Sequence, residues 1–494
     1  MILSYANSLL LVAVNIFLTP FLIKSLGDSE YGVYQMMSSF AGYLVLINFG
    51  TGTVMTRYVS IALANKDKKS EKNYIATCLV ITATLGLIIL IAAMVLYAFI
   101  ESIYSNSMTT EQIEKAKVLY LFVAGNVFVT LIAQTFQGVI NAYEKFAVNN
   151  LWQILRTFLK AFLIVLLFSF KTDSVIIVGV DLVLSVALLI FNVCYLVFPL
   201  KVRWKLYSFD KEIFTSSLLF ALAVFLQSIV NQVNTKVDIT VLGIMIGPES
   251  TTRYSVAMQV FSVFSSVSTA AMAVFLPKFS RMFASKKPDG EAITKAMIAP
   301  SRVQTLASGA VLCGFLLCGR DFINVWVGEE YAFSWIIAII VMIPYFLVYF
   351  NGVIVSVLDA MNKRLVRSVV LAGVAVFNVG LTVLLVHLFG EIGAPVGTAI
   401  ATLAGSVIVM NIYYVKTLGI KFKLLCSQVL KGILPSLLLA SAVSLPFALT
   451  LDTNLKGLLI KGSVFTVSLL VCLFWFGFNK EEKSFISGII KRRK

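Results

Sequence analysis

Long apolar runs separated by short polar joints make up most of the chain. Crossing the hydrocarbon core of a bilayer takes about 20 apolar residues, and lipid accepts backbone only as a helix or a closed barrel. The runs are too long and continuous for barrel strands, so the pattern predicts transmembrane helices. Fourteen are expected, at residues 1–26, 31–57, 75–100, 117–141, 149–170, 175–199, 212–244, 252–277, 302–319, 333–357, 367–388, 393–415, 430–450 and 457–478.

Composition agrees with this pattern. Only 13% of the 494 residues are charged, against roughly 25% in soluble domains, and the mean hydropathy is +0.93. We therefore expect an all-α integral membrane protein. The first run has no basic leader and is too long for a signal-peptide core, so we expect it to remain in the mature protein.

The positive charge, +16 in total, is concentrated in alternate joints. Because basic loops stay in the cytoplasm, joints such as "ANKDKKSEK", "KVRWK" and the tail "GIIKRRK" are predicted to be cytoplasmic. The intervening joints "GDSE", "GPES" and "LDTN" carry no Lys or Arg. Both termini are then cytoplasmic, which requires an even number of spans. Topology accounts for the charge, and no nucleic-acid partner is expected.

Several kinds of chemistry are disfavoured. The single histidine, His387, argues against a histidine metal site or a Ser-His-Asp triad. The six cysteines lie mostly inside apolar runs, and Cys313 and Cys318 are too far apart for a CxxC pair. We expect no metal, no cofactor and no catalytic residue. The short outer joints also disfavour a membrane enzyme such as a polysaccharide polymerase or ligase.

The chain contains an internal repeat. Residues 140–150 read "INAYEKFAVNN" and residues 358–368 read "LDAMNKRLVRS", 218 positions later. Other anchors keep nearly the same offset: Gly27 with Gly247, Arg57 with Lys278, Asn192 with Asn411, and Tyr195 with Tyr414. The repeat contains six helices, an even number, so both copies cross the membrane in the same direction. Parallel repeats of this kind build transporters, with the substrate path between the two bundles.

The repeat predicts four parts: a six-helix lobe over residues 1–205, a second six-helix lobe over 206–425, two further helices over 426–478, and a basic cytoplasmic tail over 479–494. The expected fold is thus about fourteen transmembrane helices, arranged as two parallel-repeat bundles around a central cavity plus two C-terminal helices. Pro20 and Pro344 are predicted to kink or loosen their helices.

Polar residues inside a span are costly, and they normally face a bundle interior or a wet cavity. Three predicted spans carry polar stripes at helical spacing. The stripe of residues 212–244 comprises Gln227, Asn231, Asn234 and Asp238, with Gln232 and Lys236 beside it; the stripe of 117–141 comprises Asn126, Thr130, Gln134, Gln137 and Asn141; the stripe of 149–170 comprises Asn149, Gln153, Arg156 and Lys160. Amides offer both donors and acceptors and so suit hydroxyl-rich ligands. The alternative is polar packing between helices.

The cations predict an anionic ligand. Arg156 lies on the order of 10 Å from the cytoplasmic end of its span, and Lys160 about 6 Å deeper. With Arg57 and Lys236 they would bind a phosphate-bearing headgroup, because Arg offers a planar fork and Lys a point charge. The alternative is that Arg57 and Arg156 only mark the membrane interface.

The acid Asp238 is the candidate for ion coupling, since a buried carboxylate can titrate near neutral pH. It could instead pair with Lys160 or another cation and keep its charge. Asp181 is the other acid inside a span.

Two stretches resemble a known family. "LTPFLIKSLGDSEYGVYQMMSSFAGYLVLINFGTGTVMTRYVS" and "DITVLGIMIGPESTTRYSVAMQV" are similar to the starts of the two halves of Wzx-type oligosaccharide flippases. These belong to the multidrug/oligosaccharidyl-lipid/polysaccharide exporter (MOP) superfamily. The family usually carries a short basic stretch before the first helix, whereas here Met1 opens almost directly into it.

The resemblance implies alternating-access flipping of an undecaprenyl-pyrophosphate-linked oligosaccharide across the bacterial cytoplasmic membrane, for surface polysaccharide synthesis. Expected partners are this lipid-linked oligosaccharide, membrane lipid, and a polysaccharide polymerase with its chain-length proteins. The rival readings are an ion-coupled multidrug extruder and a lipid II flippase of the same superfamily. An extruder would favour twelve spans and a more acidic, aromatic cavity.

Overall fold

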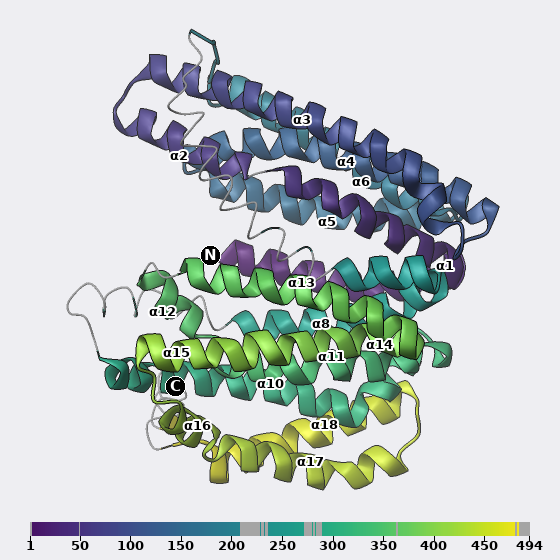
Figure 1. Ribbon diagram of the computed structural model, residues 1–494, viewed down its shortest axis with the longest axis vertical. Coiled ribbons are helices and arrows are strands. Elements are labelled where there is room, and N and C mark those ends of the chain that lie inside the picture. Colours follow the sequence, from purple (N-terminus) through teal and green to yellow (C-terminus); the bar gives the residue numbers. More distant parts are fainter. Residues whose placement is uncertain are drawn as a thin grey trace. The chain divides into compact units, whose positions relative to one another are not determined.

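A computed structural model describes residues 2–48, 50–207, 236–270, 289–361 and 364–479, together with Ser228, Gln232, Phe279, Met282, Glu482 and Lys483 (Figure 1). These residues are helical apart from short turns and joints, and contain no strand. The prediction of an all-α membrane protein is confirmed.

The spans agree with the predicted number. Ten helical segments in the described part of the chain are long and apolar enough to cross a membrane. Two of them, Leu10–Ala64 with 55 residues and Val366–Leu418 with 53, are long enough for two crossings each. They correspond to four predicted spans, so the ten segments cover twelve. The other two predicted spans, 212–244 and 252–277, lie partly outside the described residues.

The chain divides into two compact units, Met1–Thr252 (unit 1) and Arg253–Lys494 (unit 2). In unit 1, α4 packs against α1, α2, α3 and α6, and α5 packs against α1 and α6. The helices of unit 1 are α1 (Ile2–Gly42), α2 (Thr51–Ala64), α3 (Lys68–Tyr104), α4 (Thr110–Ala142), α5 (Phe146–Phe168) and α6 (Ser174–Val197). Residues 236–247 also belong to unit 1, where the Ser39 hydroxyl of α1 donates to the Lys236 carbonyl oxygen at 3.0 Å.

Local sequence signals fix where these helices begin. The Asp67 side chain accepts hydrogen bonds from the backbone N–H groups of Lys69 and Ser70 and so caps α3. Thr109 and Gln112 form a reciprocal capping box at the start of α4. Both caps lie in polar joints, so the joints stop one helix and start the next.

The second predicted span is broken, which the apolar pattern did not reveal. Its first part continues α1, a 3-10 turn follows at Tyr43–Asn48, and α2 starts after Gly50, whose φ of 67° is left-handed. Within α1 the backbone leaves helical geometry at Gly27 (φ 78°) and not at Pro20. The break therefore follows glycines, which adopt positive φ without steric cost.

The described residues of unit 2 are also helical apart from turns and joints. Its helices are α8 (Pro248–Ala270, which begins in unit 1), α10 (Gly290–Trp326), α11 (Phe333–Phe350), α12 (Ile354–Ala360), α13 (Arg364–Phe389), α14 (Gly393–Ala401), α15 (Met410–Leu418), α16 (Phe422–Leu430), α17 (Ile433–Thr450) and α18 (Leu455–Cys472). The tenth predicted span is interrupted at residues 351–353, between α11 and α12. Pro344 lies inside α11, so the interruption is not at the proline.

The two units repeat one buried contact at the register of the sequence repeat. In unit 1 the Asn192 amide donates to the Ala133 carbonyl oxygen of α4 at 3.1 Å. In unit 2 Asn411 accepts a hydrogen bond from Asn351, 218 positions after Ala133. The compact units divide the chain after Thr252. The boundary of the sequence repeat after residue 205 remains a prediction.

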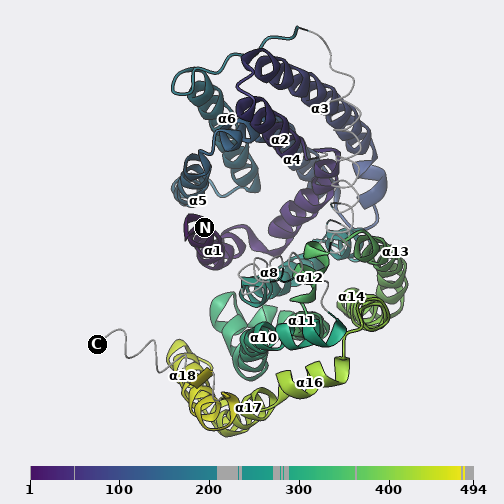
Figure 2. The ribbon, with the colours of Figure 1, turned by 90° about the vertical axis from the view of Figure 1, so that its left-hand side faces the viewer.

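The helices α17 and α18 pack on α10 within unit 2 (Figure 2). Arg302 of α10, 4% exposed, donates to the carbonyl oxygens of Gln428, Lys431 and Gly477 and to the Glu482 carboxylate. A second buried ion pair joins Lys461 of α18 to Asp321 of α10 at 2.5 Å. Two separate cations, Arg302 and Lys461, thus link α10 to the segments that contain the last two spans.

Candidate functional site

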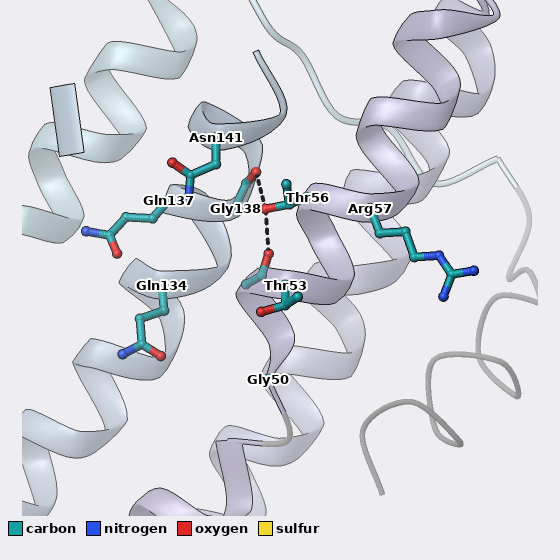
Figure 3. Close-up of a pocket in the computed structure, with 9 residues that line it drawn as sticks. Gly50, Thr53, Thr56, Arg57, Gln134, Gln137, Gly138 and Asn141 are labelled. Atoms are coloured by element: carbon teal, nitrogen blue, oxygen red, sulfur yellow. Dashed lines mark hydrogen bonds between the residues drawn. The ribbon is translucent and has the colours of Figure 1, made fainter. Parts of the chain in front are cut away.

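A pocket of about 440 Å³ opens between α2 and α4 in unit 1 (Figure 3). It is lined by Gly50, Gly52, Thr53, Thr56, Arg57, Gln134, Gln137, Gly138 and Asn141. Four of these, Arg57, Gln134, Gln137 and Asn141, were predicted site residues. The fold thus brings the end of the second span next to the polar stripe of the fourth.

Two glycines let α2 and α4 approach closely beside this pocket. A Cβ atom at Gly138 would lie 2.3 Å from the Gly52 carbonyl oxygen, so only glycine fits there. The Thr56 hydroxyl lies 2.9 Å from the carbonyl oxygens of both glycines and ties the two helices together. The break before α2 and this close approach together shape the pocket.

The residues that line the pocket are three glycines, two threonines, three amide residues and Arg57. In Figure 3 the glutamines Gln134 and Gln137 extend from α4, whereas the Arg57 guanidinium extends away from α4. Arg57 therefore offers its charge at a different edge of the pocket from the amides. Such a surface presents donors and acceptors to a hydroxyl-rich ligand.

The amide stripe continues onto α5. The Asn149 amide donates to Asn141 Oδ1 at 2.7 Å, which joins the start of α5 to the end of α4. Gln137 Nε2 and Asn149 Oδ1 are buried, and neither has a hydrogen-bond partner in the part of the chain that the structure describes. Gln153, one turn further along α5, is half-buried, and its carbonyl oxygen accepts a hydrogen bond from Thr157.

The two cations of α5 form a cluster with α6. Lys160 Nζ lies 2.7 Å from Asp181 Oδ2, and Arg156 lies 3.9 Å from Asp181 Oδ1 while donating to the Ser185 hydroxyl at 3.0 Å. Lys160 pairs with Asp181 and not with Asp238, which was the alternative partner considered from the sequence. Asp181 and Ser185 face α5 since they lie four residues apart on one side of α6.

The predicted stripe of residues 212–244 is described only in part. Gln227, Asn231 and Asn234 lie outside the described residues. Lys236 is half-buried and Asp238 is 4% exposed. These two residues are not among those that line the pocket between α2 and α4.

Sequence reasoning missed part of this site. Gly52, Thr53, Thr56 and Gly138 were not selected, although "GTGT" after an apolar run signals a helix restart. Asp181 was noted only as an acid within a span. Asp181 and Ser185 lie four residues apart, as do Arg156 and Lys160. This matching spacing is the signal that would have predicted contact between the two helices.

Together, the spans, the repeated bundles and the polar pocket define a multi-pass membrane protein with the fold of MOP superfamily transporters. The chain matches the family of polysaccharide biosynthesis proteins over residues 3–283. This match covers more than half of the chain, so the chain belongs to that family.

Several known proteins are similar to this chain. The uncharacterized membrane protein EpsK of Bacillus subtilis (strain 168) is 21% identical, and the alignment covers 98% of this chain and 96% of that protein. The lipid II flippase MurJ, in an inward closed conformation, has a TM-score of 0.74 at 16% identity, covering 96% of this chain and 98% of that one. An inward-facing MATE multidrug resistance transporter has a TM-score of 0.59 at 16% identity, covering 83% of this chain and 95% of its own.

Proposed function

We propose that this protein flips an undecaprenyl-pyrophosphate-linked oligosaccharide from the inner to the outer leaflet of the bacterial cytoplasmic membrane by alternating access. The flipped product would supply surface polysaccharide synthesis. Both termini would be cytoplasmic. The polysaccharide polymerase and its chain-length proteins would act on the product afterwards.

The observation that carries this proposal is the grouping of predicted residues in unit 1. Amides line the pocket between α2 and α4, and the cations Arg156 and Lys160 lie on the adjacent α5. An oligosaccharide has many hydroxyls, and a pyrophosphate has several negative charges. Amides suit the first group and an Arg–Lys pair suits the second.

We assign the parts of the ligand accordingly. The pyrophosphate would bind Arg156 and Lys160, with Arg57 and Lys236 as further cations along the path. The sugars would bind Gln134, Gln137, Asn141, Asn149 and Gln153, with Gln227, Asn231 and Asn234 as the amides of the second half. The prenyl chain would stay in lipid. Asp238 would couple transport to an ion.

An ion-coupled multidrug extruder is the competing function, since it shares the fold. Extruders that take cationic drugs need acidic or aromatic cavities, because a cationic ligand is repelled by like charge. The α5–α6 cluster has two cations for one acid. This excess of positive charge favours an anionic ligand.

Transport in proteoliposomes tests the proposal. The purified protein should move isotope-labelled lipid-linked oligosaccharide between leaflets and should not accumulate cationic drugs. Drug transport without oligosaccharide transport would refute the proposal.

Single variants test the assigned cations in cells. Arg156→Ala and Lys160→Ala should abolish complementation of a flippase-deficient strain while protein stays in the membrane. Lys117→Ala is the matched control, since Lys117 forms an ion pair with Glu101 at 2.6 Å outside the proposed site. If both α5 variants still made the full amount of surface polymer, the two cations would not be part of the substrate path.

A further inference from the structure

We propose that Asp181 is a displaceable counter-ion: its carboxylate holds Lys160 and Arg156 in the empty protein, and a phosphate group of the substrate takes its place. This inference rests on the proposed function and names the residue with which the substrate competes. It makes Asp181 a residue that sets affinity for anions without binding the substrate itself.

The cluster is open to a ligand. The Lys160, Arg156 and Asp181 side chains are 31%, 21% and 18% exposed, so none of the three is enclosed by the helix packing. The Lys461–Asp321 pair of unit 2 differs, because Lys461 is only 3% exposed and its charge is matched one to one. That pair is built for packing, whereas the α5–α6 cluster is accessible.

The cluster is also unbalanced in charge. Two cations share one carboxylate, and in the described part of the chain no other acid forms an ion pair with either of them. A net positive charge inside a span is costly, and an added anion reduces that cost. Arg156 and Lys160 lie four residues apart on α5, so one phosphate group can contact both.

The second repeat shows that joining these helices does not need charge. Asn378 lies 218 positions after Lys160, and Thr398 lies 217 positions after Asp181. In unit 2 these two residues form a neutral hydrogen bond of 3.2 Å between α13 and α14. Val374 takes the place of Arg156. This helix pair is thus held without ions in one copy, so the ions at the matching place in the other copy are not needed to join the helices.

A phosphate competes well with the carboxylate. It offers more acceptor oxygens and more negative charge than Asp181, and the planar Arg fork binds two of its oxygens at once. Competition also excludes weakly charged lipids, because a ligand must bind the two cations more strongly than Asp181 does.

Binding of inorganic pyrophosphate to the full-length protein, measured by calorimetry in an uncharged detergent, tests this proposal. Asp181→Thr copies the residue of the second repeat and should lower the Kd at least about tenfold. The double variant Lys160→Asn with Asp181→Thr reproduces the neutral pair and should bind at least about tenfold more weakly than Asp181→Thr. Asp321→Asn, the control, should stay within about twofold of wild type.

An Asp181→Thr variant that folds and binds pyrophosphate no better than wild type would overturn the proposal. A structure of wild-type protein with pyrophosphate gives a test without any variant. It should show Lys160 bound to phosphate and separated from Asp181, and an intact 2.7 Å Lys160–Asp181 pair in that complex would equally overturn it. Tighter binding by Asp181→Thr without oligosaccharide transport by wild type would reject only the proposed function.

Discussion

Lys115 bridges two carboxylates at one end of the unit 1 helices. Its ammonium lies 2.8 Å from Glu30 and 2.9 Å from Asp173, so one side chain of α4 links α1, just after its break at Gly27, to the start of α6. Arg253 and Glu391 make the corresponding link in unit 2, at 2.8 Å. Ion pairs thus link helices next to short polar joints, for which the sequence predicted no role.

The pKa of Asp173 predicts how one of these links responds to acid. Burial alone would raise this pKa, but hydrogen bonds from Lys115, the Val175 amide and Lys171 outweigh it and lower the pKa from 3.8 to about 2. A lowered pKa means that the contribution to stability is complete above pH 3.8 and is lost as pH falls towards 2.

The expected result is a Tm difference between wild type and Asp173→Asn that is constant near neutral pH and shrinks between about pH 4 and pH 2. Thermal unfolding in detergent, followed by tryptophan fluorescence, measures it. A difference that does not change over this range would contradict the assignment.

At the scale of elements, glycines decide how α2 and α4 pack. The hydrophobic pattern places both helices correctly but says nothing of their separation. Gly52 and Gly138 bring the two backbones together, and Gly50 allows the break that starts α2 at the pocket. The pocket would change shape if either contact were lost.

Gly138→Ala tests this packing. The new Cβ would lie 2.3 Å from the Gly52 carbonyl oxygen and 2.9 Å from Met55 Cβ, so α2 must move. We expect a loss of about 1–3 kcal/mol in the free energy of unfolding. Gly125→Ala on the same helix is the control, because its Cβ would lie 3.9 Å from Leu182, and its effect should stay under about 1 kcal/mol. Equal destabilisation by both changes would argue against close backbone contact.

At the scale of the whole molecule, the fourteen predicted spans would place both termini on the same side. The distribution of Lys and Arg predicts that this side is the cytoplasm. Labelling of single cysteines in a cysteine-free background with a membrane-impermeant maleimide tests the orientation. Ser105→Cys and Glu330→Cys should react in intact cells, and Lys69→Cys and Thr417→Cys only after permeabilisation. All four positions are exposed. The reverse labelling pattern would invert the predicted topology and the proposed direction of transport.

Much of the architecture was determined by the sequence alone. The spans, the repeat and the polar stripes could be read from single residues and local windows, because lipid forces an apolar run of sufficient length to become a helix. The same local rule placed Arg57, Gln134, Gln137 and Asn141 on faces that do meet at one pocket.

Only the tertiary structure decided which polar groups are partners. Asp181, and not Asp238, pairs with Lys160, and Arg302 donates to carbonyl oxygens of two distant segments, residues 428–431 and Gly477. Hydropathy averages over a window of one chain segment, whereas an ion pair or a close glycine contact joins residues far apart in sequence, so hydropathy alone does not reveal these contacts.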